Sequence, residues 1–185
     1  MGTPKSRLRL TREAWLAQAL DILADDPEHL RIDEIASRLG VSKGSFYWHF
    51  ENRSDFVRSL AEFWRDANTQ SVIDTLKQQV GTPEDRLYTL MRLLVEQKAA
   101  QYDLAVRAWA RHEPEIAPVI REVDELRLRT LRGLFADMGF EEPELSMRTR
   151  TFVIAHSFNH LLTVGLSRKE ALEQLEARHA FFTRR

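Results

Sequence analysis

Side chains that could bind DNA cluster in residues 40–53, the stretch GVSKGSFYWHFENR. Lys43 can donate to the O6 and N7 atoms of guanine, and Ser45 can hydrogen-bond to either type of base. Trp48 offers an apolar contact to a thymine methyl. Gly44 has no side chain, so a partner can approach the backbone closely there. These four residues are the candidates for reading bases.

Other polar side chains of this stretch suit the phosphate backbone. Tyr47, His49 and Arg53 carry donors that can reach phosphate oxygens, which position a protein on DNA without reading its sequence. Asn52 and Arg53 also lie where a helix is predicted to begin, and free N–H groups there attract an anion. The predicted DNA-binding residues are Ser42, Lys43, Gly44, Ser45, Tyr47, Trp48, His49 and Arg53.

The four aromatic residues of the stretch divide into two pairs on a helix that begins at Ser42. Phe46 and Phe50 are four residues apart and share a face, which predicts that they hold the helix against the core. Tyr47 and Trp48 lie on other faces beside polar residues. The alternative is that Tyr47 and Trp48 pack beneath the following helix, since large aromatics are usually mostly buried.

A second short helix is predicted to precede this one. Ile32, Ile35, Ala36 and Leu39 stand at positions i, i+3, i+4 and i+7, and Gly40 follows as a helix-ending glycine. Two short helices joined at a glycine form a helix-turn-helix, whose second helix enters the major groove of DNA. The features around Tyr47 and Trp48 therefore favour a contact surface.

Nearly all of the remaining chain is predicted to be helical. The 7 glycines and 6 prolines fall at boundaries, and no segment alternates between apolar and polar residues. Start signals stand at Thr11, at Ser42, at Asn52 or Ser54, at residues 82–85 (Thr-Pro-Glu-Asp) and at residues 167–170 (Ser-Arg-Lys-Glu). The prediction is an all-α protein with about nine helices.

Composition excludes several classes of function. The 185 residues include no cysteine, which rules out disulfides, thiolate zinc sites and cysteine nucleophiles. No apolar run could cross a membrane and the N-terminus lacks a signal-peptide core, so a cytoplasmic protein without a membrane partner is expected. Net charge is only −1, yet Lys5, Arg7, Arg9 and Arg12 precede any acidic residue and form a basic arm. No catalytic, cofactor or metal-binding motif was found, and no enzyme is predicted.

The segment IDEIASRLGVSKGSFYWHFENRSDFV resembles the DNA-binding signature of the TetR family of bacterial repressors. It combines Ile-Ala-x-x-Leu-Gly-Val-Ser with Phe-Tyr-x-His-Phe and a basic residue three positions later. The resemblance implies an all-α homodimer with a three-helix DNA-binding head, residues 1–53, and a ligand-binding and dimerisation body, residues 54–185. It also implies base-reading positions at Lys43, Gly44, Ser45 and Trp48, and phosphate-contacting positions at Tyr47, His49 and Arg53. Many members carry a threonine before the second helix, where this chain has Leu30-Arg31-Ile32.

The body is predicted from its pattern to hold an effector pocket. Tyr102, Val106 and Trp109 form an apolar stripe at i, i+4 and i+7, and aromatic and methionine residues of other helices could meet it. The alternative is an ordinary core. Arg107 could bind an anionic ligand or pair with Asp124. The predicted pocket residues are Trp64, Tyr88, Met91, Tyr102, Val106 and Trp109.

The end of the chain is predicted to form a dimer interface. The stretch TFVIAHSFNHLLTVGL is apolar on almost every face, so a partner subunit could cover it in a four-helix bundle across a two-fold axis. The alternative is burial within one protomer. His156 and His160 could share a metal, but Ser157 and the lack of a third ligand argue against that. The predicted interface residues are Phe152, His156, Asn159, Leu162, Leu172, Leu175, His179 and Phe182.

The sequence thus predicts a ligand-responsive transcriptional regulator, in the role of a repressor. Its partners would be a pseudo-palindromic double-stranded DNA operator, a second copy of the chain and a small-molecule effector that releases the DNA. No cofactor is expected. The alternative is a helical small-molecule-binding protein or enzyme that retains a vestigial DNA-binding head.

Overall fold

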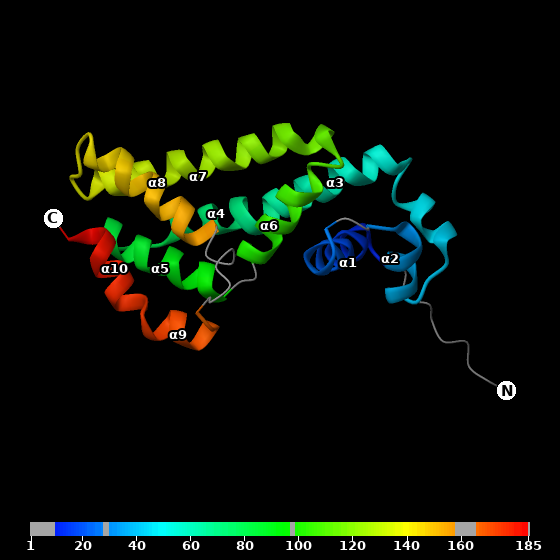
Figure 1. Ribbon diagram of the computed structural model, residues 1–185, viewed down its shortest axis with the longest axis horizontal. Coiled ribbons are helices and arrows are strands. Elements are labelled where there is room, and N and C mark those ends of the chain that lie inside the picture. The colour runs from blue at the N-terminus through cyan, green and yellow to red at the C-terminus, as the bar shows by residue number, and fades with distance from the viewer. Residues whose placement is uncertain (1–9, 28–29, 97–98, 158–165, 185) are drawn as a thin grey trace.

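The computed structural model describes residues 10–27, 30–96, 99–157 and 166–184, and within these ranges the chain forms helices without strands. Figure 1 shows an elongated molecule with a small head at one end and a larger body at the other. The described α-helices number ten, which agrees with the all-α prediction of about nine helices. Those of the head and rod are α1 (Arg12–Asp25), α2 (Ile32–Arg38), α3 (Arg53–Arg65) and α4 (Ser71–Gln78).

The predicted signals at Thr11, Asn52 and Gly40 are confirmed, whereas the side chain of Ser42 makes no capping hydrogen bond to the segment that follows it. The side chain of Thr11 accepts a hydrogen bond from the backbone N–H of Ala14 and caps α1. The side chain of Asn52 accepts one from the N–H of Asp55, 2.9 Å away, and caps α3. Gly40 adopts a φ of 66°, which a residue with a side chain rarely does, and turns the chain after α2.

A cluster of aromatic rings forms the centre of the head. Phe46 and Phe50 are fully buried, with ring centroids 4.9 Å apart. The Phe46 ring also meets Trp15 of α1 at 5.7 Å and Phe56 of α3 at 5.4 Å, both edge-on. The predicted inward pair is therefore confirmed. Each buried phenylalanine stabilises the fold by about 1.5–3 kcal/mol relative to exposure.

The segment Lys43–Trp48 is a 3₁₀-helix, labelled η1. The side-chain spacing predicts an α-helix from Ser42 to Phe50, so the type of helix differs from the prediction. The N–H of Ser45 donates to the carbonyl of Ser42, three residues back, at 2.9 Å. In a 3₁₀-helix, side chains three residues apart lie above one another. Ser45 and Trp48 therefore share a face, in place of the pairs four residues apart that an α-helix predicts.

A continuous helical rod leads from the head into the body. The predicted single helix to about Gln79 is present as α3, a π-helical segment over Asp66–Gln70 and α4. The π-segment contains one wider turn, which buries two polar residues, Asn68 and Thr69.

The other helices of the body pack around this rod. They are α5 (Pro83–Glu96), α6 (Ala99–Trp109), α7 (Ala117–Asp137), α8 (Glu144–Ser157), α9 (Arg168–Glu173) and α10 (Leu175–Thr183), with a short 3₁₀ turn, η3 (Pro114–Ile116), before α7. Helix α7 packs against α8, α5 against α10, and α6 against α1 of the head. Ser167 and Glu170 make the predicted capping box at α9.

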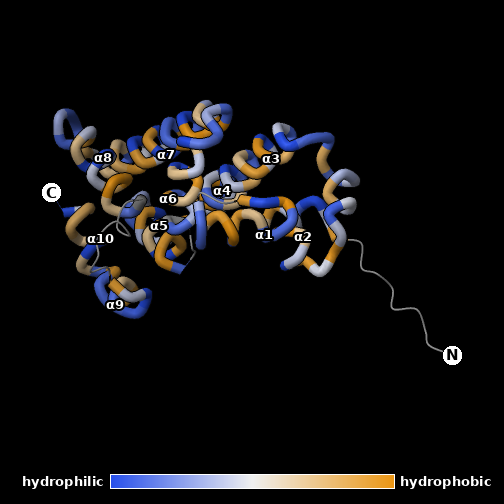
Figure 2. Tube along the Cα trace, turned by 45° about the vertical axis from the view of Figure 1, so that its right-hand side comes forward, coloured by the Kyte–Doolittle hydropathy of each residue, from blue (hydrophilic) through white to orange (hydrophobic). Residues whose placement is uncertain are grey.

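Two apolar clusters hold the molecule together. The first contains the head rings together with Trp64, Val106 and Trp109, so it crosses the boundary expected at residue 53. The second joins α4, α5, α7, α8 and α10 at the other end, around Phe135 and Phe152. Figure 2 shows hydrophobic and hydrophilic residues interspersed along the labelled helices. None of the helices in the described part is long and apolar enough to cross a membrane.

Candidate nucleic-acid interface and ligand cavity

Two large aromatic side chains project from η1 into solvent. Tyr47 is 62% exposed and Trp48 is 84% exposed, whereas their neighbours Phe46 and Phe50 are buried. Exposed aromatic rings on a soluble protein mark surfaces that meet a partner. The alternative, in which both residues pack beneath the following helix, does not hold in this structure.

Gly44 lies in this exposed turn for no reason internal to the fold. Its φ is not in the left-handed region, and a Cβ atom built there would have Ser42 Oγ as its nearest neighbour, 3.7 Å away. A larger residue would therefore fit in the free protein. Without a side chain at Gly44, the backbone of this turn is open to close approach.

The basic side chains of this surface are held by carboxylates of the same chain. Lys43 Nζ lies 3.0 Å from Asp33 Oδ1 of α2, and Arg53 Nη1 lies 2.5 Å from Glu113 Oε1, just before η3. Both cations are more than half exposed, and exposed ion pairs contribute little stability. A phosphate can therefore replace either carboxylate at small cost.

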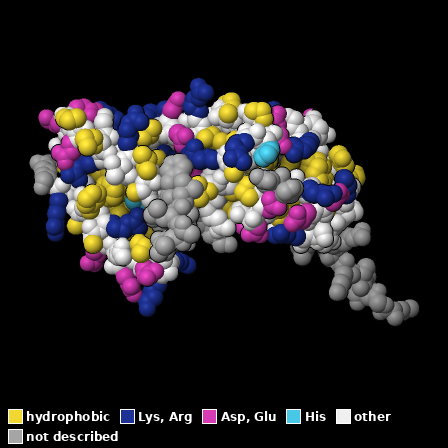
Figure 3. Space-filling view, viewed as in Figure 1, with side chains coloured by type: hydrophobic (Ala, Val, Ile, Leu, Met, Phe, Trp, Pro, Cys, Tyr) yellow, Lys and Arg dark blue, Asp and Glu magenta, His cyan; other side chains and the backbone are white. Residues whose placement is uncertain are grey.

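The remaining DNA-binding candidates lie around Tyr47 and Trp48. Ser42 is exposed, whereas Ser45 and His49 are partly buried. Arg12 does not belong to a free basic arm: its guanidinium donates to Ser59 at 2.6 Å and lies over the Phe50 ring. Lys5, Arg7 and Arg9 lie outside the described residues. On the face in Figure 3, Lys and Arg side chains are interspersed with Asp and Glu.

The six predicted pocket residues are not brought together around one cavity. Trp64, Val106 and Trp109 are buried in the first apolar cluster. Tyr102 donates its hydroxyl to Asp21 of α1 at 2.6 Å, and burial, followed by that hydrogen bond, raises its pKa to about 12. The other two, Tyr88 and Met91, belong to the second cluster. Most of these side chains form ordinary core.

A cavity lies instead between the rod and helices α5 to α8, and with its open mouth it encloses about 640 Å³. Its wall combines apolar side chains with polar groups from the π-segment, α6, α7 and α8. The lining residues are Asn68, Thr69, Val72, Leu76, Leu90, Leu94, Asp103, Arg127, Thr130, Leu131, Phe152, Val153 and His156.

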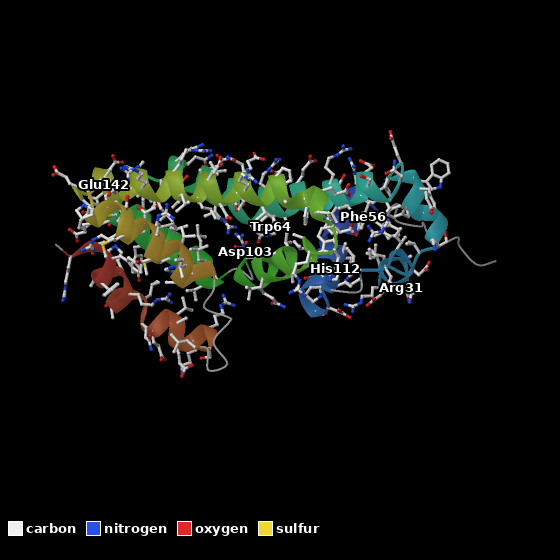
Figure 4. All side chains as sticks on the ribbon, turned by 45° about the horizontal axis from the view of Figure 1, so that its top comes forward. Arg31, Phe56, Trp64, Asp103, His112 and Glu142 are labelled. Atoms are coloured by element: carbon white, nitrogen blue, oxygen red, sulfur yellow. The ribbon has the colours of Figure 1, made fainter. Side chains whose placement is uncertain are left out.

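The polar groups at the rod side of the cavity satisfy one another. The guanidinium of Arg127 donates to both carboxylate oxygens of Asp103 and to Thr69 Oγ1, at 2.8 and 3.0 Å. It also lies over the ring of Trp64. Figure 4 shows Trp64 and Asp103 near each other in the middle of the molecule. Because Arg127 and Asp103 pair with each other, the rod side of the cavity presents no unpaired charged side chain to a ligand among the residues that line it.

His156 forms the polar group at the α8 side of the cavity. Its ring stacks on Phe152 at 4.0 Å, and its Nδ1–H donates to the Phe152 carbonyl at 2.9 Å. Its Nε2 accepts from Arg178 of α10 at 3.3 Å. Burial lowers the pKa of His156 to about 4, and the Arg178 charge adds to this effect against the opposing hydrogen bond. The imidazole is therefore neutral at physiological pH.

Of the two alternatives for Arg107, the ion pair is present. Its guanidinium binds both carboxylate oxygens of Asp124, with an Nη1–Oδ2 distance of 3.1 Å.

Among the described residues no group of three histidines or carboxylates is arranged to hold a metal, and His160 lies outside those residues.

The predicted dimer residues mostly lie inside one protomer. Phe152, Leu175 and Phe182 are buried in the second cluster, and the Phe152 and Phe182 rings are 5.0 Å apart. His179 is partly buried and contacts the Glu84 carbonyl at 2.9 Å. Leu172 is 37% exposed. Asn159 and Leu162 lie outside the described residues. Helix α10 of the same chain thus covers much of the apolar surface of α8.

An exposed apolar stripe that the pattern did not predict runs along α8 and α10. Met147 and Ile154 are seven residues apart on α8 and are 67% and 59% exposed. Phe181 of α10 is 70% exposed and lines a surface groove with Met147 and Thr151. We refer to Met147, Thr151, Ile154 and Phe181 as the α8–α10 stripe.

Comparison with known proteins relates the head to one family. Residues 16–60 match the profile described as "Bacterial regulatory proteins, tetR family". The tetracycline repressor protein class C of Escherichia coli is 42% identical over 55 residues, which are 29% of this chain. The chain spans only 25% of that curated relative's length.

Solved structures resemble nearly the whole chain. A TetR transcriptional regulator from Legionella pneumophila superposes with a TM-score of 0.74 at 14% identity, over 96% of this chain and 97% of that one. The transcriptional regulator FadR from Bacillus subtilis, solved in complex with stearoyl-CoA, gives a TM-score of 0.66 at 14% identity, over 93% and 97% of the two chains. At these identities the likeness establishes the fold.

Proposed function

We propose that this chain, which belongs to the TetR family of bacterial regulatory proteins, is a ligand-responsive repressor that binds operator DNA through η1. The observation that carries the proposal is the exposed Trp48, presented with Tyr47 from a segment that matches the family profile. The residues of η1 read bases, while Tyr47, His49 and Arg53 hold phosphates.

Operator recognition requires two heads. Helix-turn-helix dimers read half-sites about 34–36 Å apart, one helical turn of DNA, so the operator is a pseudo-palindrome. The α8–α10 stripe supports a two-fold interface, because a second copy would bury side chains that a monomer leaves in water. In this arrangement α8 and α10 of each protomer form a four-helix bundle, with residues 1–53 as the head and 54–185 as the body.

The effector binds in the cavity of the body and acts on the head through α6. This helix contributes Asp103 to the cavity wall and ends four residues before Glu113, the partner of Arg53. Figure 4 shows Asp103 in the body and His112 towards the head. A shift of α6 moves Glu113 and changes the position of the head. A coupling free energy of about 1–3 kcal/mol lowers operator affinity roughly 5- to 150-fold.

A gel-shift titration tests the proposal. The probe is the DNA upstream of the protein's own gene, compared with a scrambled sequence at several salt concentrations. A regulator gives sequence-selective binding that weakens as salt rises, because phosphate contacts release counterions. If no fragment is bound selectively even at low salt, the head is vestigial and the chain is a small-molecule-binding protein.

A further inference from the structure

Asn68 is a buried amide in the wall of the cavity. It belongs to the π-segment between α3 and α4 and is 8% exposed. Its Nδ2 donates to the carbonyl of Trp64 at 3.2 Å, and because a carbonyl only accepts, this bond fixes which end of the amide is the nitrogen. Among the described residues no group donates to the Oδ1 atom. One N–H and the oxygen of this amide are thus left for a partner outside the chain.

The other uncharged polar side chains of the wall have less capacity left. Thr130 donates its hydroxyl to a carbonyl of its own helix at 2.9 Å, and Thr69 accepts twice from Arg127. His156 uses both ring nitrogens, one on a backbone carbonyl and one on a guanidinium. Asn68 is therefore the uncharged side chain of the described wall that can offer a ligand the most hydrogen bonds.

A missing partner alone does not identify a binding group, since Gln79 also has an amide oxygen without one. The Gln79 oxygen, however, is enclosed by protein, and Gln79 does not line the cavity. The Asn68 oxygen is not among the enclosed atoms of the described residues, so it is reached from the open space that Asn68 lines. A molecule in the cavity can therefore donate a hydrogen bond to it.

The charged side chains of the wall neutralise each other. Asp103 and Arg127 both line the cavity, and each carboxylate oxygen of Asp103 accepts from Arg127. The imidazole of His156 is neutral at physiological pH, and Arg178, which contacts it, does not line the cavity. An ionised group that entered would lose its water without meeting an opposite unpaired charge on the described wall, which is unfavourable. These surroundings favour an uncharged ligand.

The rest of the wall is largely apolar. Val72, Leu76, Leu90, Leu94 and Leu131 provide no hydrogen-bonding side chain. A ligand that contacts them gains from an apolar body, and a polar group of that ligand finds its partner where the wall is polar. A hydroxyl group suits the amide oxygen, because it is a hydrogen-bond donor that carries no charge.

We propose that the cavity binds an uncharged molecule with an apolar body, whose hydroxyl group donates to Oδ1 of Asn68. The proposal rests on the effector role of the cavity in the proposed function, and it names the chemical class of the effector. It assigns a role to the buried amide that the π-segment places in the wall: the amide orients the ligand.

Calorimetric titration with three probes of equal chain length tests the charge of the ligand. Octanol, octanoate and octylammonium have the same apolar body and a neutral, negative or positive head. We expect octanol to bind at least roughly 10-fold more tightly than either ion, because only the ions bring a charge that the wall does not pair. An ion that binds as tightly as octanol, or no binding of octanol, overturns the proposal.

An isomer of octanol tests the hydrogen bond. Heptyl methyl ether has the same atoms as octanol but no O–H group, so it cannot donate to Asn68. We expect it to bind roughly 3- to 10-fold more weakly than octanol, the effect of one net hydrogen bond. Equal affinity for the two isomers rejects the donor role of the ligand.

Variants locate the contact. Asn68→Leu keeps a side chain of similar size without the amide, so the preference for octanol over its isomer is expected to disappear while the ether still binds. Gln70→Leu is the matched control, because Gln70 is an amide of the same π-segment that bonds to Asp74 and does not line the cavity. A preference that survives Asn68→Leu, or that Gln70→Leu removes equally, overturns the proposal. The probes on the unaltered chain test the ligand class independently of how either variant folds.

Operator binding separates failure of this inference from failure of the proposed function. It is measured without ligand, in the same preparation of the full chain. Selective operator binding with no preference for octanol rejects the uncharged ligand and keeps the regulator. Preferential binding of octanol without operator binding rejects the regulator and keeps the ligand class.

Discussion

The guanidinium of Arg53, in the first turn of α3, lies 2.5 Å from the carboxylate of Glu113, at the junction between α6 and η3. A candidate phosphate contact of the head is thus occupied, in the free protein, by an acid of the body. Beside this pair, Ser54 donates to Glu115 at 3.0 Å. Glu113 follows the end of α6 by four residues, and α6 contributes Asp103 to the cavity wall.

Glu113→Gln is expected to tighten operator binding. The variant removes the charge that competes with phosphate for Arg53, and an exposed ion pair corresponds to about a two- to fivefold change in affinity. Fluorescence anisotropy at low salt measures the effect. Glu142→Gln is the charge-matched control, since Glu142 lies at the opposite end of the molecule (Figure 4). An equal gain in both variants would assign the effect to net charge.

Arg53→Ala is expected to weaken the binding of every DNA sequence alike. The loss of one phosphate contact lowers the slope of log affinity against log salt by about one unit. Binding measured on operator and scrambled DNA over a salt series gives this slope. An unchanged slope would show that Glu113 keeps Arg53 even in the complex.

Trp48→Ala is expected to change base preference and leave stability unaltered. The side chain is 84% exposed, so its removal creates no cavity. Selection of bound sequences from a randomised half-site compares the two proteins, with thermal unfolding as the check on folding. Equal losses on cognate and scrambled DNA would contradict a base-reading role for Trp48.

Ile154→Glu and Phe181→Glu are expected to dissociate the proposed dimer. Each variant places a charge in the α8–α10 stripe, where burial against a second copy would leave it unpaired. Sedimentation velocity distinguishes monomer from dimer. Val80→Glu is the control, because Val80 is an exposed apolar residue at the end of the rod. A dimer that persists in both stripe variants places the interface elsewhere.

His156 is expected to destabilise the protein in acid. Its folded pKa of about 4 is below the unfolded value of 6.5, so only the unfolded chain binds the proton between these values. The free energy of unfolding therefore falls as pH decreases from about 6.5 to 4, by up to about 3 kcal/mol from this residue. Urea unfolding at both pH values, compared with His156→Gln, isolates the contribution. Parallel pH profiles for the two proteins would reject it.

Local features of the fold could be predicted from the sequence because short-range physics decides them. Caps at Thr11 and Asn52, the turn at Gly40 and the inward pair Phe46 and Phe50 depend only on neighbouring residues. The exposure of Tyr47 and Trp48 followed from the same spacing. Because η1 is a 3₁₀-helix, however, Trp48 shares a face with Ser45.

The cavity could not be predicted in this way, because the walls of a cavity and a solid core use the same residue types. Trp109 and Leu76 are both buried apolar residues of helices, yet only Leu76 faces empty space. Which of them does so depends on how helices distant in sequence pack. The predicted dimer interface had the same ambiguity, because an apolar helix face can be covered by another subunit or by its own chain. Here Phe182 of the same chain covers the apolar surface of α8 around Phe152.

The π-segment between α3 and α4 relates the length of the rod to the direction in which the head points. A π-turn closes with one residue more than an α-turn, so deleting one residue from Asp66–Gln70 would convert the segment towards α-helix and change the rotation of the head relative to the body. In the proposed dimer, such a rotation would turn both recognition surfaces away from a shared face of the double helix. Under the proposed function, the number of residues in this rod therefore matters for DNA recognition as much as the side chains of η1.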